Sequence, residues 1–211
     1  MMEFAIYGLI AYLLGSIPTA VWIGKSWYGL DVREHGSKNA GATNTFRVLG
    51  KKPGILVLLI DVAKGAIAAA LPVILSSITP GIPKDHLIQI QIVASICAVT
   101  GHVFPLFAQF KGGKGVATSL GVIIGLHPVA ALISFGVFLV VFVISKFVSL
   151  GAITAALCFP LIIRFVLKED SVWLIGFSVV LSLLVILAHR RNIQRLLKGE
   201  ENKMNLFKKT T

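Results

Sequence analysis

The chain has 211 residues, of which 56% are hydrophobic and only 14% are charged, and its mean hydropathy is +0.88. This composition excludes an ordinary soluble globule, in which about a quarter of the residues are charged. It predicts a polytopic membrane protein whose core is the helix bundle itself. The two cysteines, Cys97 and Cys158, lie inside apolar runs. We therefore expect buried, inert thiols and no disulfide framework.

The formal net charge of +11 raises the question of a nucleic-acid partner. In a chain this apolar, the position of the charges is more informative than their sum. Most basic residues fall between the apolar segments rather than on one polar domain. The charge therefore indicates a membrane surface, and we expect no nucleic-acid partner.

Apolar segments long enough to cross a bilayer of about 30 Å occur first at 4–24, 54–76 and 88–108. The first has neither a basic start nor a small-residue cleavage site, which favours a retained helix over a signal peptide. An uncharged run then extends from Gly115 to Ser145. It is too long for one helix and too short for two full spans. Two further spans are predicted at 147–167 and 172–189.

Positive charge decides how the long run is divided. Connections 25–53 and 109–115 and the tail 190–211 hold 15 of the 20 basic residues. A single crossing by the run would put the tail opposite the two connections, against the tendency of basic loops to stay cytoplasmic. Division at His127-Pro128 gives helices 116–126 and 128–145. The first would be only about 17 Å long, so we expect it to be tilted, re-entrant or shielded by protein.

The resulting prediction is an all-α integral membrane protein with about seven transmembrane helices, some short, and six as the alternative. The amino terminus lies outside and the carboxyl terminus in the cytoplasm. The whole chain, 1–211, forms one polytopic domain with its active site on the cytoplasmic side.

Three polar segments on that side are too specific for ordinary loops. The first, 36–47, combines two glycines that allow close backbone approach with neutral donors and a guanidinium suited to phosphate. Its candidate binding residues are Gly36, Ser37, Asn39, Gly41, Thr43, Asn44 and Arg47. The alternative for this segment is a capped turn between helices.

The second segment runs from Gly101 through His102 to Thr118 and contains Lys111-Gly112-Gly113-Lys114-Gly115 just before a helix. A flexible backbone, a cation and a positive helix end together suit a phosphate. It is not a Walker loop, because glycine follows Lys114 where Ser or Thr would be required. The alternative is a tight turn with a lysine extending to the membrane surface.

The third segment, 189–201, places His189, Asn192 and Leu196 on one helical face, with Arg195 beside Asn192. A basic amphipathic end lying on headgroups is the alternative, and it is preferred for Arg190, Arg191 and Lys198. Within the second span, Asp61 and Lys64 stand three residues apart and are predicted to form a structural ion pair.

These three segments carry a resemblance. They read G-S-x-N-x-G-A-T-N-x-x-R, G-H-x-F-P-x-F-x-x-F-K-G-G-K-G-V-A-T and H-x-x-N-I-x-R-L-L-x-G-x-E. In this order they resemble the signatures of the bacterial membrane-embedded, acyl-phosphate-dependent glycerol-3-phosphate acyltransferases, over nearly the whole chain. The resemblance implies acyl transfer from acyl phosphate to the 1-hydroxyl of sn-glycerol 3-phosphate in the inner membrane. Lysophosphatidic acid and phosphate are the implied products, in the first step of phospholipid synthesis.

Acyl phosphate is a mixed anhydride with a good leaving group, so such an enzyme needs no covalent nucleophile. None of the five histidines is followed by Asp at the fifth position, which argues against the His-x4-Asp mechanism of other glycerolipid acyltransferases. Lys114, with the amides of Gly113 and Gly115, is predicted to bind the acyl phosphate. The predicted catalytic residues are Lys114, Ser37, His189 and His102.

Arg47, Ser37, Thr43 and Asn44 are predicted to hold glycerol 3-phosphate and the oxyanion. The general base is His189, His102 or a phosphate of the substrate itself. Ser145 and Ser149 are predicted as further contacts near the cytoplasmic start of the sixth span. The remaining predicted binding residues are Gly36, Asn39, Gly41, Gly112, Asn192 and Arg195.

We expect lipid as a surrounding partner and no cofactor, metal site or obligate protein partner. The rival class is a small anion transporter, which would carry polar groups near the midplane and inverted repeats. A noncatalytic membrane scaffold would not need two phosphate-binding loops. The chain shows neither transporter feature, because its polar segments gather at one face and differ from each other.

Overall fold

A computed structural model describes residues 1–78 and 84–204, and within these residues every regular element is a helix. The all-helical architecture predicted from the apolar runs is therefore confirmed. Two compact units, Met1–Pro128 and Val129–Thr211, divide the chain and are described in turn. Of the predicted cytoplasmic tail, Lys208 and Lys209 lie outside the described residues.

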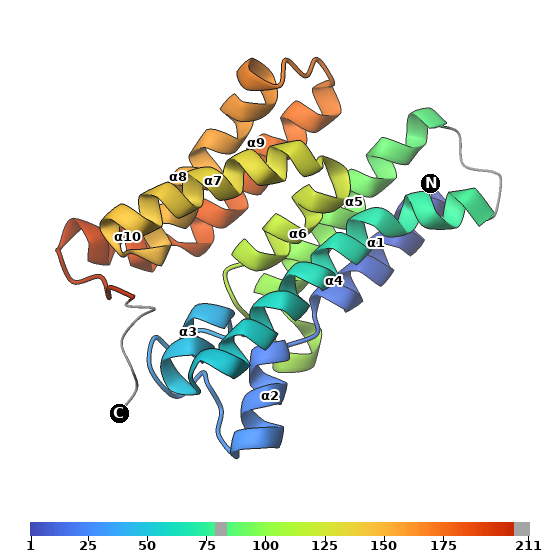
Figure 1. Cartoon of the computed structure of the whole chain (residues 1–211). Helices are drawn as coiled ribbons and strands as arrows, with labels where there is room; N and C mark the ends of the chain where they lie inside the picture. The colour runs from blue at the N-terminus through green and yellow to red at the C-terminus, as the bar shows by residue number, and fades with distance from the viewer. Residues whose placement is uncertain (79–83, 205–211) are drawn as a thin grey trace. The chain divides into compact units, whose positions relative to one another are not determined.

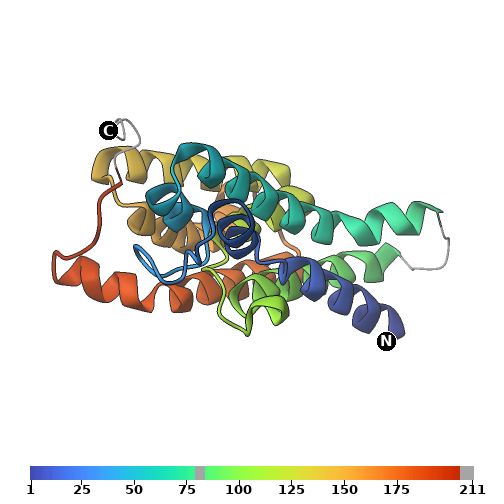
Figure 2. The ribbon, with the colours of Figure 1, turned by 90° about the horizontal axis from the view of Figure 1, so that it is seen from below.

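Three long helices run side by side in the first unit, namely α1, α4 and α5 (Figures 1 and 2), and α6 packs along α4. The elements of this unit are α1 (Met2–Gly15), α2 (Thr19–Tyr28), α3 (Ala42–Val48), α4 (Lys51–Ile78), α5 (Lys84–Val103), the 3-10 turn η1 (Leu106–Ala108) and α6 (Val116–Leu126).

The prediction of one continuous helix over 4–24 is wrong, because α1 ends at Gly15 and α2 begins at Thr19. Pro18, the residue before α2, has no N–H and its ring crowds the carbonyl four residues earlier, which favours a break in the helix at this point. The two helices still form an apolar stretch, Met2–Tyr28, that is long enough to span a membrane.

Glycines bring the helices of the first unit into backbone contact. A Cβ added at Gly121 of α6 would lie 2.0 Å from the Val62 carbonyl oxygen of α4, and one at Gly65 of α4 would lie 2.3 Å from the Thr118 carbonyl oxygen. Likewise, a Cβ at Gly15 of α1 would lie 2.0 Å from the Ala98 oxygen of α5. Small residues at such contacts are the usual basis of helix association in lipid.

The second unit begins at Val129, directly after Pro128, which is the first residue of α7. Its elements are α7 (Pro128–Ser145), α8 (Val148–Leu161), a π-helical turn η2 (Ile162–Val166), α9 (Val172–Ala188) and α10 (Arg190–Leu197). The predicted division at His127-Pro128 and the bounds 116–126 and 128–145 are confirmed. Proline suits the first helical position because its missing N–H is not needed there.

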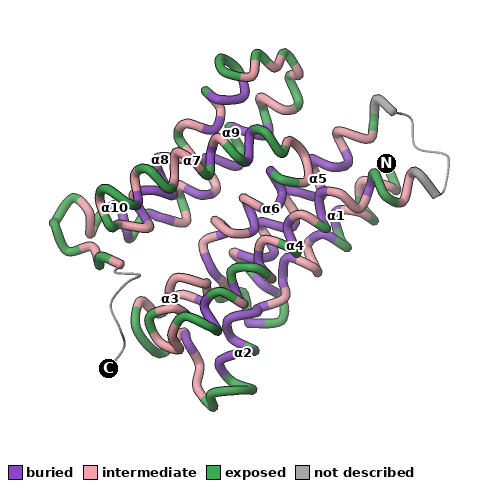
Figure 3. The backbone as a smooth tube through the Cα atoms, in the orientation of Figure 1, coloured by how far each residue is buried: buried purple, intermediate pink, exposed green. Residues whose placement is uncertain are grey.

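Five helical segments among the described residues are long and apolar enough to cross a membrane. A sixth arises if α9 and α10, which meet at a bend of 61°, count as one span, while α6 is a shorter apolar helix of 11 residues. The predicted count of seven, which includes α6, stays a prediction. Exposed apolar residues on the outward faces of the helices (Figure 3), such as Leu59, Leu132 and Leu183, suit contact with lipid.

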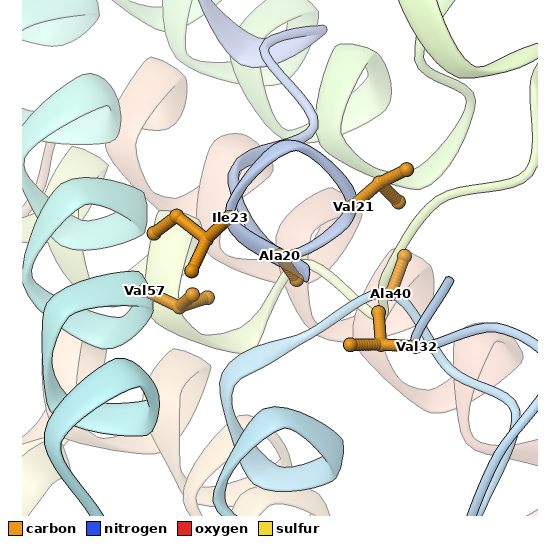
Figure 4. Close-up of a cluster of buried hydrophobic side chains, with 6 residues drawn as sticks. All are labelled: Ala20, Val21, Ile23, Val32, Ala40 and Val57. Atoms are coloured by element: carbon orange, nitrogen blue, oxygen red, sulfur yellow. The ribbon is translucent and has the colours of Figure 1, made fainter. Parts of the chain in front are cut away.

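A small apolar cluster supports the connection between α2 and α3 (Figure 4). It joins side chains of α2, of that connection and of α4, and it consists of Ala20, Val21, Ile23, Val32, Ala40 and Val57. The first signature segment is thus built on a packed base rather than on a free loop.

Candidate active site

Asn44 holds the first signature segment in shape. Its Oδ1 accepts hydrogen bonds from the Ser37 N–H at 2.8 Å and the Ser37 hydroxyl at 3.0 Å. Its Nδ2 donates to the carbonyl oxygens of Val32 at 2.7 Å and His35 at 3.1 Å. This uses the full hydrogen-bonding capacity of the amide. Asn44 therefore organises the loop that carries Ser37, while its predicted contact with the substrate stays a prediction.

Glycine is required at position 36 on two grounds. Gly36 has φ +58, in the left-handed region, and a Cβ there would lie 2.5 Å from Asn44 Oδ1. At Gly41, which precedes α3, the carbonyl accepts hydrogen bonds from the N–H groups of Asn44 and Thr45, each at 3.1 Å. The two predicted glycines thus form the turn and start the helix.

Thr43 and Arg47 stand four residues apart on α3, so they lie on one side of this helix. Thr43 is half-buried, Arg47 is exposed, and Asn39 in the preceding turn is half-buried. The structure therefore offers a hydroxyl and a guanidinium on the same side of α3. That pair suits a phosphate ester.

Arg33, for which the sequence predicts no role, lies just before the first signature segment and links that connection to the second segment. Its guanidinium binds both carboxylate oxygens of Asp31, with Nη2 at 2.7 Å from Oδ2, and Nη1 donates to the Ala108 carbonyl oxygen at 3.0 Å. Lys25 Nζ lies 3.3 Å from the same carboxylate. The bond from Arg33, which outweighs the effect of burial, holds the pKa of Asp31 well below its usual range, and the carboxylate raises the pKa of Arg33.

The glycines of the second signature segment lie directly against His102. The Gly113 N–H donates to the His102 carbonyl oxygen at 3.1 Å. A Cβ at Gly112 would lie 2.1 Å from that oxygen, and one at Gly113 would lie 2.1 Å from His102 Nε2. The loop before Lys114 is therefore fixed to the end of α5 and is no ordinary flexible turn.

Gly115 and the first turn of α6 follow at once. Gly115 has φ +79 and caps α6, and the half-buried Lys114 precedes it. The hydroxyls of Thr118 and Ser119 are buried and have no hydrogen-bond partner among the described residues. A cation, a helix amino terminus and two such hydroxyls are therefore adjacent along the chain, a combination that suits an anion.

The predicted ion pair within the second span is confirmed, with Lys64 Nζ 2.8 Å from Asp61 Oδ1. The same oxygen accepts a hydrogen bond from the Thr19 hydroxyl at 3.1 Å, and His102 Nδ1 lies 3.7 Å away. Lys64 also donates to the Ile17 carbonyl oxygen at 2.9 Å, at the break between α1 and α2. Sequence spacing indicated the pair but gave no sign of its link to His102.

The third signature segment lies in the second unit. His189 stands at the bend between α9 and α10 and is the N-cap residue of α10, where its carbonyl oxygen accepts hydrogen bonds from the N–H groups of Asn192 and Ile193. His189 and Asn192, which were predicted to share a helical face, are both buried. The ring is buried, with Nδ1 2.7 Å from the Val185 carbonyl oxygen. Because that oxygen only accepts, Nδ1 carries hydrogen and Nε2 is the basic nitrogen of the neutral ring.

Three predicted binding residues of the second unit converge on Glu201, which had been assigned no role. Its Oε1 accepts hydrogen bonds from Ser149 Oγ at 2.9 Å and Asn192 Nδ2 at 2.7 Å, and its Oε2 binds Arg195 Nε at 2.8 Å. Burial favours the neutral acid, yet these hydrogen bonds outweigh it and lower the pKa of Glu201. Ser149, Asn192 and Arg195 therefore hold the tail against α8 and α10.

Ser145, a further predicted contact, is used locally. Its hydroxyl donates to the Val141 carbonyl oxygen at 2.7 Å and accepts from the Phe147 N–H at 3.1 Å. It shapes the turn between α7 and α8. The first two signature segments thus lie within the first unit, where Arg33 links the connection that carries the first to Ala108 of the second, and the residues of the third assemble within the second unit.

Comparison with known proteins identifies the family of the chain. The family model described as glycerol-3-phosphate acyltransferase matches residues 5–199. Among curated relatives, glycerol-3-phosphate acyltransferases of Fusobacterium nucleatum and Chlorobaculum tepidum are 46% and 42% identical. The first alignment covers 96% of this chain and 98% of the relative, and the second covers 99% and 100%.

The fold also matches a crystal structure of PlsY, an integral membrane glycerol 3-phosphate acyltransferase, in its glycerol 3-phosphate form. The TM-score is 0.86 at 39% identity, covering 97% of this chain and 99% of the other. The lysophosphatidic acid form of PlsY matches with a TM-score of 0.82 at 38% identity, covering 96% of each chain. Similarity over nearly the whole length, in sequence and in fold, shows that this integral membrane enzyme belongs to the glycerol-3-phosphate acyltransferase family.

Proposed function

We propose that the acyl donor is an acyl phosphate, and that the products are lysophosphatidic acid and inorganic phosphate. The observation that supports this most directly is the Gly112–Gly115 loop, which packs against His102. The loop is followed by α6, whose first turn contains the buried hydroxyls of Thr118 and Ser119. Such a loop suits a phosphate leaving group. A solved relative in a lysophosphatidic acid form supports the same product.

The reaction forms one ester bond and breaks one anhydride bond. The 1-hydroxyl oxygen of glycerol 3-phosphate attacks the acyl carbonyl carbon, and the bond from that carbon to the phosphate oxygen breaks. Lys114 and the amides of Gly113 and Gly115 stabilise the charge that develops on the departing phosphate. Catalysis then rests on holding two anions and orienting one hydroxyl.

Glycerol 3-phosphate is assigned to the first signature segment. Arg47 and Thr43, on one side of α3, bind its phosphate, while Ser37, held by Asn44, orients the attacking hydroxyl. The backbone at Gly36 and Gly41 and the side chain of Asn39 line this position. In the second unit, Asn192, Arg195 and Ser149 act through Glu201 by holding the tail.

The proton of the attacking hydroxyl passes either to Nε2 of His189 or to a phosphate oxygen of glycerol 3-phosphate itself. His102 is not proposed as the base, because its ring is enclosed by Gly113 on one side and Asp61 on the other. An acceptor analogue without an ionisable oxygen near the hydroxyl distinguishes the two cases. It keeps the chemical step at saturation if His189 is the base and loses it if the substrate phosphate is.

Donor choice tests the proposal as a whole. Detergent-purified protein is given glycerol 3-phosphate with palmitoyl phosphate or with palmitoyl-CoA, and lysophosphatidic acid and phosphate are measured. We expect turnover with palmitoyl phosphate only, with one phosphate released per lysophosphatidic acid. Equal rates with both donors would remove the assigned role of the loop while leaving the acyltransferase activity in place.

A further inference from the structure

Asp61 lies at the centre of a polar network buried among four segments of the first unit. One carboxylate oxygen, Oδ1, receives Lys64 Nζ at 2.8 Å and the Thr19 hydroxyl at 3.1 Å, and faces His102 Nδ1 at 3.7 Å. The four residues are between 1% and 6% exposed. They come from α2, α4 and α5, and Lys64 adds the Ile17 carbonyl oxygen at the break after α1.

A buried ion pair of this kind is a costly way to hold helices together. Apolar residues of similar volume stabilise a bundle equally well or better, because two charges must otherwise be removed from water. Ionisable residues inside membrane helices therefore indicate a role beyond packing. The glycine contacts already join α4 to α6 and α1 to α5 without any charge.

The network reaches the second signature segment through one side chain. His102 is the member whose ring touches Gly113 and whose carbonyl oxygen binds the Gly113 N–H. At 3.7 Å from Nδ1, beyond hydrogen-bond distance, the Asp61 carboxylate acts on the ring by its charge, and it favours the tautomer and ring orientation that direct hydrogen on Nδ1 toward it. A rotation of that ring would press on Gly113, and Lys114 is the next residue.

From these contacts we infer that Asp61 is a positioning residue of the acyltransferase, acting through His102 on the Gly112–Gly115 loop. Lys64 and Thr19 hold the Asp61 carboxylate in the orientation that restrains His102. The inference rests on the proposed role of this loop in binding the acyl phosphate. A displacement of about 1 Å in such a loop is enough to cost up to about a hundredfold in rate.

The test removes both charges at once, so that no buried charge is left without its partner. The variant Asp61→Leu with Lys64→Met is compared with His102→Ala and with the combination of all three changes. The matched control is Gln91→Leu, because Gln91 also joins α5 to α4 by a buried hydrogen bond, from Nε2 to the Ala69 carbonyl oxygen at 3.0 Å. It lies 11 residues before His102, about three helical turns away.

Initial rates are measured against palmitoyl phosphate and glycerol 3-phosphate. We expect the charge-free variant to lose about 10- to 100-fold in kcat/KM for palmitoyl phosphate, while the KM for glycerol 3-phosphate changes by less than about twofold. Because Asp61 acts through His102, the combined variant should be no worse than His102→Ala alone. Gln91→Leu should stay within about twofold of wild type.

Additive losses in the combined variant, or a charge-free variant that behaves like Gln91→Leu, would overturn the inference. If the charge-free variant does not fold, Thr19→Val gives the same comparison, because it removes one hydrogen bond to Asp61 and no charge. Thr19→Val should lower kcat/KM for palmitoyl phosphate about threefold in the otherwise wild-type protein. It should cause no further loss when combined with His102→Ala, because its effect passes through His102. Wild-type protein inactive with palmitoyl phosphate would instead refute the proposed donor.

Discussion

Gly113 of the second signature segment leaves no room for a side chain beside the His102 ring. Alanine there would place its Cβ 2.1 Å from His102 Nε2, so either the ring or the loop must move. We expect Gly113→Ala to lower kcat/KM for the acyl donor by about a hundredfold, since Lys114 is displaced with the loop. Steady-state kinetics of the purified enzyme measure this.

A glycine with open space provides the control. A Cβ at Gly136 of α7 meets nothing within 4 Å. Gly136→Ala should therefore keep wild-type kinetics and raise helix stability by up to about 1 kcal/mol. If Gly113→Ala were as active as Gly136→Ala, a methyl group would fit between the loop and the His102 ring, contrary to the distances above.

Glu201 makes part of the stability of the second unit dependent on pH. Its pKa is lowered in the folded protein, so its contribution is complete above the ordinary carboxyl pKa of about 4.3 and is lost as the pH falls below it. Glu201→Gln should thus lower the Tm at pH 7 and have a smaller effect near pH 4. Thermal unfolding of both proteins in detergent at the two pH values tests this.

Glu200 is the natural control, because it is exposed and precedes Glu201 directly. The three hydrogen bonds from Ser149, Asn192 and Arg195 all go to the Glu201 carboxylate. Glu200→Gln should leave the Tm nearly unchanged at both pH values. A Glu201→Gln variant whose Tm deficit is the same at pH 7 and pH 4 would contradict the assignment of the carboxylate as the bonded form.

At the scale of elements, the contact between α4 and α6 depends on glycine. Gly121→Ala would put a methyl group 2.0 Å from the Val62 carbonyl oxygen, which is backbone and cannot rotate away. Forcing the helices apart should cost about 1–3 kcal/mol, the usual range for overpacking. Gly176→Ala on α9, where a Cβ meets nothing within 4 Å, is the matched variant.

The Tm of the two alanine variants in detergent decides the matter. A large decrease is expected for Gly121→Ala and none for Gly176→Ala. If both variants unfold at the wild-type temperature, close backbone contact is not what joins α4 to α6.

At the scale of the whole molecule, the distribution of basic residues predicts which loops share a side of the membrane. Lys38, Lys111 and Lys203 are exposed and should face the cytoplasm, whereas Lys168, between α8 and α9, should face outward. Single cysteines at these positions, in a protein lacking Cys97 and Cys158, are treated with a membrane-impermeant maleimide. In intact cells only the cysteine at 168 should react, and inverted vesicles should give the reverse pattern.

Opposite labelling of positions 111 and 203 would contradict the predicted topology. It would favour a single crossing by Gly115–Ser145, in which α6 is a helix but not a separate membrane crossing. The predicted cytoplasmic position of the active site would then hold for only part of the signature residues.

Much of this molecule follows from local rules that a sequence contains. A span is set by the length of an uncharged run, so α4 and α7 could be located directly, and Pro128 marked where α7 begins. Pro18 is a similar local mark of the break between α1 and α2, but a hydropathy average over residues 4–24 does not register a single proline. The signature segments are predicted as anion-binding because glycines that allow close backbone approach are grouped there with lysine or arginine.

The tertiary structure alone decided how those residues are used. Ser149 and Glu201 are 52 positions apart, and Asp61 and His102 are separated by most of α4 and α5. Nothing local in the chain fixes such pairs, because they arise only when helices pack. For the same reason only the structure shows that the Asn44 side chain holds the loop that carries Ser37. Sequence determined which polar residues are grouped beside the apolar spans, and packing determined which of them are held in place and by what.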